Sequence, residues 1–249
     1  LNSNLELIIK KSDWIVICIP SAFLKTVLDT LPANIFRDKF VVSGVKGMIP
    51  EANVLLNDYL QKHFHLPLAQ YFSITGPCHA EEVATEKLSY ITISGKDENI
   101  TRRIARRFTT RYLQTIVNSA IWGAQYAAVL KNIYAIGAGM AHGLGYGDNF
   151  LAVYIANCAR EMNLFNEAVC RLEQHPYDHQ NVFTSAYLGD LLVTCYSQYS
   201  RNRTFGNMIG KGYSVKSAQL ELNMIAEGYY ASRCIFEINK KVLAQIPIA

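Results

Sequence analysis

The sequence lacks any apolar run close to the ~20 residues that a membrane-spanning helix requires. No signal peptide is recognisable at its start. Charged residues are also few, at 18% of 249 residues, and the formal net charge is only +4. Together with a hydrophobic content of 50%, these absences describe a soluble globular protein with a sizeable core.

Paired cysteines and metal-binding histidine patterns are missing as well. His63 and His65 are two residues apart, whereas His175 and His179 are separated by four, and Pro176 between them argues against a regular helix. We therefore expect no metal site. The six cysteines occur singly, without a Cys-x-x-Cys motif, which predicts a reduced cytoplasmic protein. They are Cys18, Cys78, Cys158, Cys170, Cys195 and Cys234.

One stretch is strongly basic. A surface of this kind can contact nucleic acid, but on a helix it more often forms a solvated face, and we interpret it in that way and expect no nucleic-acid partner. The cluster consists of Arg102, Arg103, Arg106, Arg107 and Arg111.

The first half of the chain alternates between short apolar runs and segments with helical spacing. This alternation is typical of a doubly wound α/β sheet with parallel strands, and we assign it to a domain of residues 1–118. The predicted strands are 13–19, 40–43, 71–75, 90–94 and 113–117, and the predicted helices are 5–11, 22–31, 51–63, 80–85 and 99–107.

From about Ser119 the strand pattern stops, and helical periodicity continues to the end of the chain. The predicted helices are 120–141, 150–172, 183–192, 214–222 and 225–239. We therefore expect a second, all-helical domain of residues 119–249. No low-complexity linker separates the halves, so a tight interface is expected, with the first of these long helices as the hinge.

Three predicted strands end in loops with turn residues. These loops contain Pro20-Ser21, Lys46-Gly47 and Gly76-Pro77-Cys78. In open α/β sheets, ligands bind beyond the carboxyl ends of the strands, so the loops are expected to share one crevice. The alternative is that turns simply require glycine and proline.

Lys131 lies in a largely uncharged helical stretch, between Leu130 and Ile133 along one apolar stripe. Burial would lower its pKa and make it a usable proton donor. The alternative, which periodicity alone favours, is a lysine whose stem covers apolar surface while its charge stays in water. The closely spaced glycines that follow Gly137 suggest close backbone packing, or an irregular turn near residues 143–148.

Several motifs together resemble NAD(P)-dependent glycerol-3-phosphate dehydrogenase of the bacterial type, over nearly the whole chain. The specific ones are Leu130-Lys131-Asn132-Ile133, Gly139-Met-Ala-His-Gly143-Leu-Gly145-Tyr-Gly147-Asp148-Asn149, Val45-Lys46-Gly47, Gly76-Pro77-Cys78-His79-Ala80-Glu81-Glu82-Val83, Leu188-Gly189-Asp190-Leu191 with Thr194-Cys195, Ser200-Arg201-Asn202-Arg203 and Ala226-Glu227-Gly228.

The resemblance implies a cytoplasmic oxidoreductase, often a homodimer, that interconverts dihydroxyacetone phosphate and sn-glycerol 3-phosphate with NAD or NADP for glycerophospholipid precursor synthesis. It implies that Lys131 is the acid/base, assisted by Lys46 and Asp190. The substrate-binding residues carried over are Lys46, Gly76, Cys78, Lys131, Asn132, Asp190, Thr194, Ser200, Arg201 and Asn202, and the cofactor-binding residues are Pro20, Lys46, Ala80, Arg201 and Glu227.

Two departures of the chain from this family bear on cofactor and substrate binding. No Gly-x-Gly-x-x-Gly follows a first strand, and we expect it to belong to missing N-terminal sequence before Leu1, so that the chain as given binds cofactor weakly or not at all. The choice between NAD and NADP is set in the same missing part. Cys78 replaces the usual serine or threonine, and a thiol is a weak donor. Two alternatives stay open: a hydroxyacid-type dehydrogenase with the same Lys-Asn pair, and a non-catalytic fragment.

Overall fold

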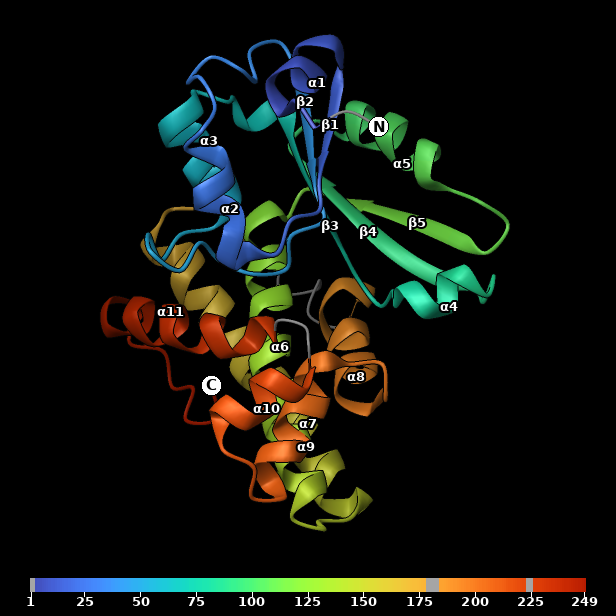
Figure 1. Cartoon of the computed structure of the whole chain (residues 1–249), viewed down its shortest axis with the longest axis vertical. Helices are drawn as coiled ribbons and strands as arrows, with labels where there is room; N and C mark the ends of the chain where they lie inside the picture. Colours follow the sequence, from blue (N-terminus) through green and yellow to red (C-terminus); the bar gives the residue numbers. More distant parts are fainter. Residues whose placement is uncertain (1–2, 178–183, 223–225) are drawn as a thin grey trace.

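The structure is a computed structural model that describes residues 3–177, 184–222 and 226–249. Figure 1 shows two parts: a twisted sheet with flanking helices carries the first half of the chain, and a group of helices carries the second. Within the described residues, no helix combines the length and the apolar character needed to cross a membrane.

The described part of the chain contains a five-stranded sheet, in which the strands follow one another in chain order. They are β1 (Trp14–Ile17), β2 (Phe40–Ser43), β3 (Tyr71–Thr75), β4 (Ser89–Gly95) and β5 (Leu113–Asn118). β1, β2 and β3 run parallel, with Ile15 opposite Val41 and Val41 opposite Tyr71. The carboxyl ends of these three strands therefore meet at one edge of the sheet.

β4 runs antiparallel to β3, and β5 is parallel to β4. The doubly wound α/β class is confirmed, but the expectation that all strands are parallel is wrong at this point. The reason is the short helix α4 (Ala80–Ala84) between β3 and β4. Five residues span only about 7.5 Å as a helix, which is too short to return the chain along the sheet, so β4 starts where β3 ends.

β2 and β3 are buried on both faces, as their continuous apolar runs predict, whereas β1 and β5 at the two edges of the sheet are partly exposed. Val41 packs against α1 (Leu5–Lys11), α2 (Ser21–Leu28) and α3 (Leu56–Phe64) on one face. Its neighbour Val42 packs against Phe72 and against Ile104 of α5 (Glu98–Phe108) on the other. α3 begins later than predicted because Asn53 has a positive φ and Ile49 bridges to Val54.

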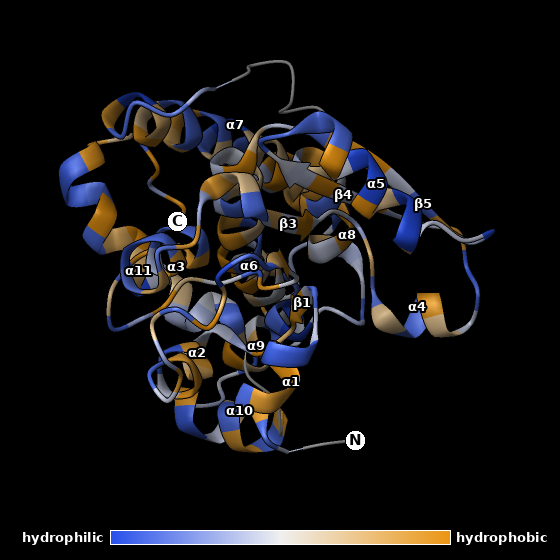
Figure 2. Ribbon diagram, turned by 90° about the horizontal axis from the view of Figure 1, so that it is seen from above, coloured by the Kyte–Doolittle hydropathy of each residue, from blue (hydrophilic) through white to orange (hydrophobic). Residues whose placement is uncertain are grey.

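α5 carries the basic cluster on its outer side. Its four arginines and Arg111, which follows the helix, are exposed, whereas Ile104 and Ala105 of the same helix are buried. Figure 2 shows α5 as largely hydrophilic. The interpretation as a solvated helix face is confirmed.

The second half consists of helices around α6 (Ile121–Gly143), which is buried along most of its length. Figure 1 shows this helix running from the sheet down through the helical part. Its neighbours are α7 (Asp148–Leu172), the π-helical turn η3 (Ser185–Gly189), α8 (Asp190–Tyr196), α9 (Arg201–Gly210) and α11 (Glu227–Val242), and α10 (Val215–Leu222) packs against α9. A 3₁₀ turn, η1 (Leu68–Gln70), precedes β3.

α6 and α9 approach each other through glycines. A Cβ on Gly139 would lie 2.7 Å from the Asn207 nitrogen, and one on Gly206 would lie 2.7 Å from the carbonyl carbon of Ile136. The expected close backbone packing is therefore confirmed. The expected turn is confirmed too, because the chain turns after α6, where Gly145 has a φ of 81°. Close backbone contact fixes where α9 begins relative to α6.

α9 itself was not predicted, because Gly206 and Gly210 weaken its helical pattern. Its buried residues, among them Asn202 and Phe205, face α6 and α11. Three other predictions fall partly outside the described residues: the start of the helix at Phe183, the start of the helix at Ile225, and the spacing of His175 with His179.

Candidate active site

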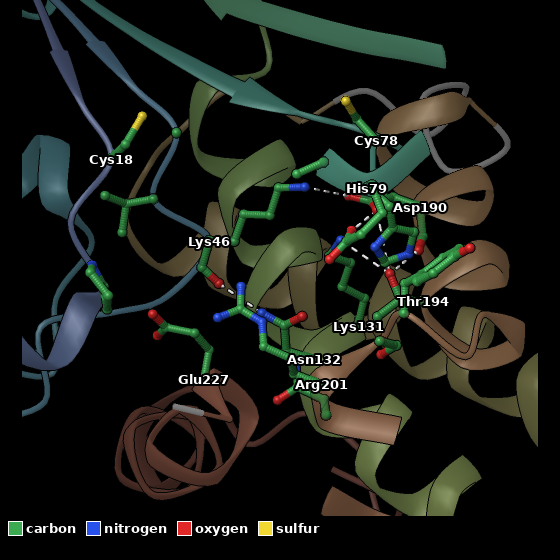
Figure 3. A pocket seen from close by; sticks show the side chains of 18 of the residues that line it. Cys18, Lys46, Cys78, His79, Lys131, Asn132, Asp190, Thr194, Arg201 and Glu227 are labelled. Atoms are coloured by element: carbon green, nitrogen blue, oxygen red, sulfur yellow. Dashed lines mark hydrogen bonds and ion pairs between the residues drawn. The ribbon is translucent and has the colours of Figure 1, made fainter. Parts of the chain in front are cut away.

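A pocket of about 430 Å³ lies beyond the carboxyl ends of β1, β2 and β3, where the sheet meets α6, α8, α9 and α11. All three loops predicted to share a crevice contribute to it, through Pro20, Lys46 and Cys78. Figure 3 shows the side chains that converge there. Every residue predicted for the site except Gly76 lines this pocket, and Gly76 lies directly behind it. The lining members are Pro20, Lys46, Cys78, Ala80, Lys131, Asn132, Asp190, Thr194, Ser200, Arg201, Asn202 and Glu227.

Lys131 is buried in this pocket with an exposed fraction of 4%. Its Nζ donates to Asp190 Oδ1 and, at 3.1 Å, to Thr194 Oγ1. Figure 3 shows these three side chains joined in one network. The snorkelling interpretation, which periodicity alone favoured, is therefore wrong. Periodicity failed because α6 is enclosed on nearly all sides, so that a polar position on it does not mark a solvent face.

Asp190 is the centre of the charged network and is 1% exposed. Its Oδ2 accepts from the backbone N–H of Gly76 at 3.1 Å and lies 4.0 Å from Lys46 Nζ. Lys46 Nζ also donates to the Gly76 carbonyl at 3.4 Å. One carboxylate at the start of α8 thus binds two ammonium groups and the loop after β3.

Burial is the main cause that lowers the pKa of Lys131 to about 8; the charge of Asp190 opposes this shift and Lys46 contributes to it. For Asp190, burial alone would raise the pKa, but the charges of Lys131 and Lys46 and the bond from Gly76 hold it below its ordinary value. At neutral pH the pair is therefore an ammonium and a carboxylate. Lys131 is close enough to its pKa to give and to accept a proton.

The two asparagines next to the cationic residues bind neighbouring backbone. Asn132 Nδ2 donates to the Lys46 carbonyl at 3.1 Å, and Asn202 Oδ1 accepts from the Gly228 N–H at 2.9 Å. Ser200 is the N-cap of α9, where its Oγ accepts from the Arg203 N–H at 3.3 Å. This arrangement places Arg201, which is exposed, at the first turn of α9. The N-terminal end of a helix favours anions.

Glu227 lies on the other side of the pocket, at the first turn of α11. Its carboxylate accepts from the Ser21 N–H at 3.0 Å and from the Ser21 hydroxyl, so it caps the start of α2. Gly47 leaves room for this contact, because a Cβ there would lie 2.7 Å from Ser21 Cβ. Sequence reasoning placed Glu227 and the Pro20-Ser21 loop at the site but did not predict the contact between Ser21 and Glu227.

The loop after β3 supplies Cys78, His79 and Ala80. Cys78 is partly buried, and burial raises the pKa of its thiol, so it faces the pocket as a neutral thiol. His79, Tyr199 and Cys18 also line the pocket and were not predicted. The sequence signal for His79 was its place inside the motif from Gly76 to Val83. The family motif has no fixed residue type at that position, so the resemblance assigned His79 no role.

Comparisons with known proteins agree over nearly the whole chain. A family model described as the C-terminus of NAD-dependent glycerol-3-phosphate dehydrogenase matches residues 120–249, and the N-terminal model of the same enzyme matches residues 1–101. The chain is similar to glycerol-3-phosphate dehydrogenase [NAD(P)+] of Chlorobium chlorochromatii, with 31% identity over 99% of this chain and 72% of the relative. A Clostridium botulinum relative with the same description is 29% identical over 98% of this chain and 72% of its own length.

A crystal structure of glycerol-3-phosphate dehydrogenase from Coxiella burnetii has the same fold. Its TM-score is 0.89 at 24% identity, and the match covers 98% of this chain and 73% of that one.

Proposed function

The chain belongs to the NAD-dependent glycerol-3-phosphate dehydrogenase family, and on this premise we propose how its pocket carries out the reaction. As a member, it is an NAD(P)-dependent oxidoreductase that interconverts dihydroxyacetone phosphate and sn-glycerol 3-phosphate, a precursor of glycerophospholipids. The observation that carries the assignment of residues is the buried Lys131, whose Nζ faces the pocket between Asp190 and Thr194.

Lys131 is the general acid for reduction and the general base for oxidation. The nicotinamide dinucleotide supplies or accepts the hydride when bound. As negative charge develops on the carbonyl oxygen of the ketone, the Lys131 ammonium stabilises it and donates its proton. Asp190 and Thr194 hold Nζ in place, and Lys46 adds positive charge and keeps the proton of Lys131 labile. In the oxidation direction, neutral Lys131 removes the proton from the secondary hydroxyl.

Arg201 binds the phosphate group of the substrate. Its guanidinium presents a planar fork that matches phosphate oxygens, and it lies at the first turn of α9, where backbone N–H groups add to the attraction. Asn202 and Ser200 hold this turn in position. Cys78 lines the pocket from the loop after β3, next to Gly76, and Asn132 lines it from α6.

The residues at the ends of β1 and β2 fit the nicotinamide half of the cofactor. Gly44 lines the pocket there, and a Cβ would lie 3.2 Å from Cys18 Sγ, so the glycine keeps space between the two strands. Pro20, Ala80 and Glu227 border the same space, with Lys46 and Arg201 nearby. We assign these five residues to the cofactor side. The relatives matched are longer, and the chain spans 72% of their length.

The division into residues 1–118 and 119–249, the homodimer and the cytoplasmic location are parts of the same proposal. The six free cysteines support a reducing compartment. A cluster of exposed apolar side chains around the turn between α6 and α7 supports a dimer, because a second copy would cover it. The cluster consists of Leu144, Tyr146, Phe150 and Val153.

The test replaces the ammonium group of Lys131 and keeps an aliphatic side chain of similar length. Lys131→Met should lower the turnover of dihydroxyacetone phosphate with NADH by about 10²- to 10⁴-fold. Lys25→Met is the matched control, because Lys25 pairs with Asp29 on the outside of α2 and should leave turnover unchanged. Near-normal turnover by Lys131→Met would contradict the assignment. Preference of the unmodified protein for a 2-oxoacid would favour the hydroxyacid-type alternative.

A further inference from the structure

His79 occupies a position in the pocket for which the mechanism above gives no role. It follows the turn after β3 as the N-cap residue of α4, but its side chain makes no capping hydrogen bond. Its ring lines the pocket and lies 6.2 Å from the ring of Tyr199, measured between centroids. Figure 3 shows the imidazole among Asp190, Thr194 and Lys131.

The Nε2 atom of His79 is withdrawn from bulk solvent and has no hydrogen-bond partner among the described residues. Among the described residues, no other side chain that lines the pocket has a buried nitrogen or oxygen without a hydrogen-bond partner. A buried polar atom without a partner costs about 1–3 kcal/mol. The neighbouring groups are already paired, since Lys131 binds Asp190 and Thr194. A ligand in the pocket is therefore the partner that Nε2 lacks.

The charges around His79 restrict what that ligand group can be. Burial lowers the pKa of the imidazole, and the ammonium groups of Lys131 and Lys46 lower it further. A neutral imidazole offers one donor and one acceptor, which suits a hydroxyl group better than a phosphate dianion. The phosphate has a cationic partner in Arg201, which comes from α9 and not from the loop after β3.

We propose that His79 is a substrate-binding residue whose Nε2 hydrogen-bonds the free hydroxyl group at the unphosphorylated end of the triose. This assignment rests on the proposed function. With the reacting carbon at Lys131 and the phosphate at Arg201, the hydroxymethyl end of the substrate points to the loop after β3. His79 then selects a phosphorylated triose that carries this hydroxyl over one that ends in a methyl group.

The test compares two substrates and three variants. Dihydroxyacetone phosphate carries the hydroxyl, and acetol phosphate has a methyl group in place of the hydroxymethyl group. His79→Leu removes the hydrogen bond, and His79→Gln places an amide nitrogen near the position of Nε2. The control is His63→Leu, because His63 is an exposed histidine on α3 that packs against Tyr59 and does not line the pocket.

His79→Leu should lower kcat/KM for dihydroxyacetone phosphate about tenfold and change it less than about twofold for acetol phosphate. His79→Gln should recover most of the loss, and His63→Leu should leave both substrates unaffected. An equal loss on both substrates, or no loss on either, would overturn the role of His79 while leaving the proposed function in place. A wild-type protein that binds NADH but turns over neither phosphoketone would overturn both proposals.

Discussion

Replacing Asp190 with asparagine should move the pH dependence of turnover to lower pH. The substitution keeps the shape of the side chain and an oxygen that can accept from the Gly76 N–H. It removes the negative charge that binds Lys131 and opposes the effect of burial on the lysine pKa. Lys131 would then be a buried ammonium with Lys46 beside it and no counterion, so its pKa must fall below about 8.

The size of this change follows from the geometry. Opposite charges ~4 Å apart interact with about 4 kcal/mol at an effective dielectric constant of about 20. At 1.36 kcal/mol for each pKa unit, this corresponds to about three pH units. Opposite charges at such distances typically move a pKa by about 1–3 units, so we expect at least one. Because both groups are nearly inaccessible to water, solvent screens little of the effect.

The assay is kcat/KM for reduction of dihydroxyacetone phosphate, measured against pH. Reduction needs protonated Lys131, so the wild-type rate should fall as pH rises through about 8, and the oxidation rate should rise over the same range. In Asp190→Asn the fall in reduction should begin at least about one pH unit lower. Lys46→Met should move it in the opposite direction, because Lys46 lowers the Lys131 pKa. If both variants kept the wild-type midpoint, Lys131 would not be the titrating acid.

Three further outcomes are expected. Arg201→Ala should raise KM for the phosphorylated substrate at least about tenfold with a smaller effect on kcat, because loss of a charge-assisted bond costs about 1.5–3 kcal/mol; an unchanged KM in steady-state kinetics would exclude the phosphate contact. Gly206→Ala should lower the free energy of unfolding in urea by about 1–3 kcal/mol, because its Cβ would overlap the Ile136 backbone. Gly147→Ala, where nothing lies within 4 Å of a Cβ, is the control. Cys78→Ser should lower KM for the triose about threefold if a stronger donor at this position reaches the substrate, and an equal or higher KM would place the thiol outside the binding contacts.

The sheet could be predicted from the sequence more completely than the helices. β2 and β3 have the predicted bounds, because short apolar runs between turn residues are typical of strands buried on both faces. The direction of β4 could not be predicted, since it depends on how far the five residues of α4 carry the chain. α9 was missed for a related reason. Gly206 and Gly210 are unfavourable in an isolated helix. They are needed here because the backbone of Ile136 and Met140 in α6 approaches them closely.

The candidate site divides in the same way. The three strand-end loops could be placed together from topology alone, and the structure brings them to one pocket. The burial of Lys131 could not be derived from periodicity, because it depends on Asp190 and Thr194, which are about sixty residues further along the chain. His79 was missed because an unpaired nitrogen can be recognised only when its surroundings are known.

The site also explains why a cationic residue is twice followed by asparagine. In Lys131-Asn132 the amide donates to the Lys46 carbonyl, which ties α6 to the loop after β2. In Arg201-Asn202 the amide accepts from the Gly228 N–H, which ties α9 to α11. A long cationic side chain has many rotamers and fixes little by itself. Each asparagine anchors the backbone next to a cation to a different element, so the distance between the proton donor and the phosphate-binding group is set by the packing of both halves of the chain.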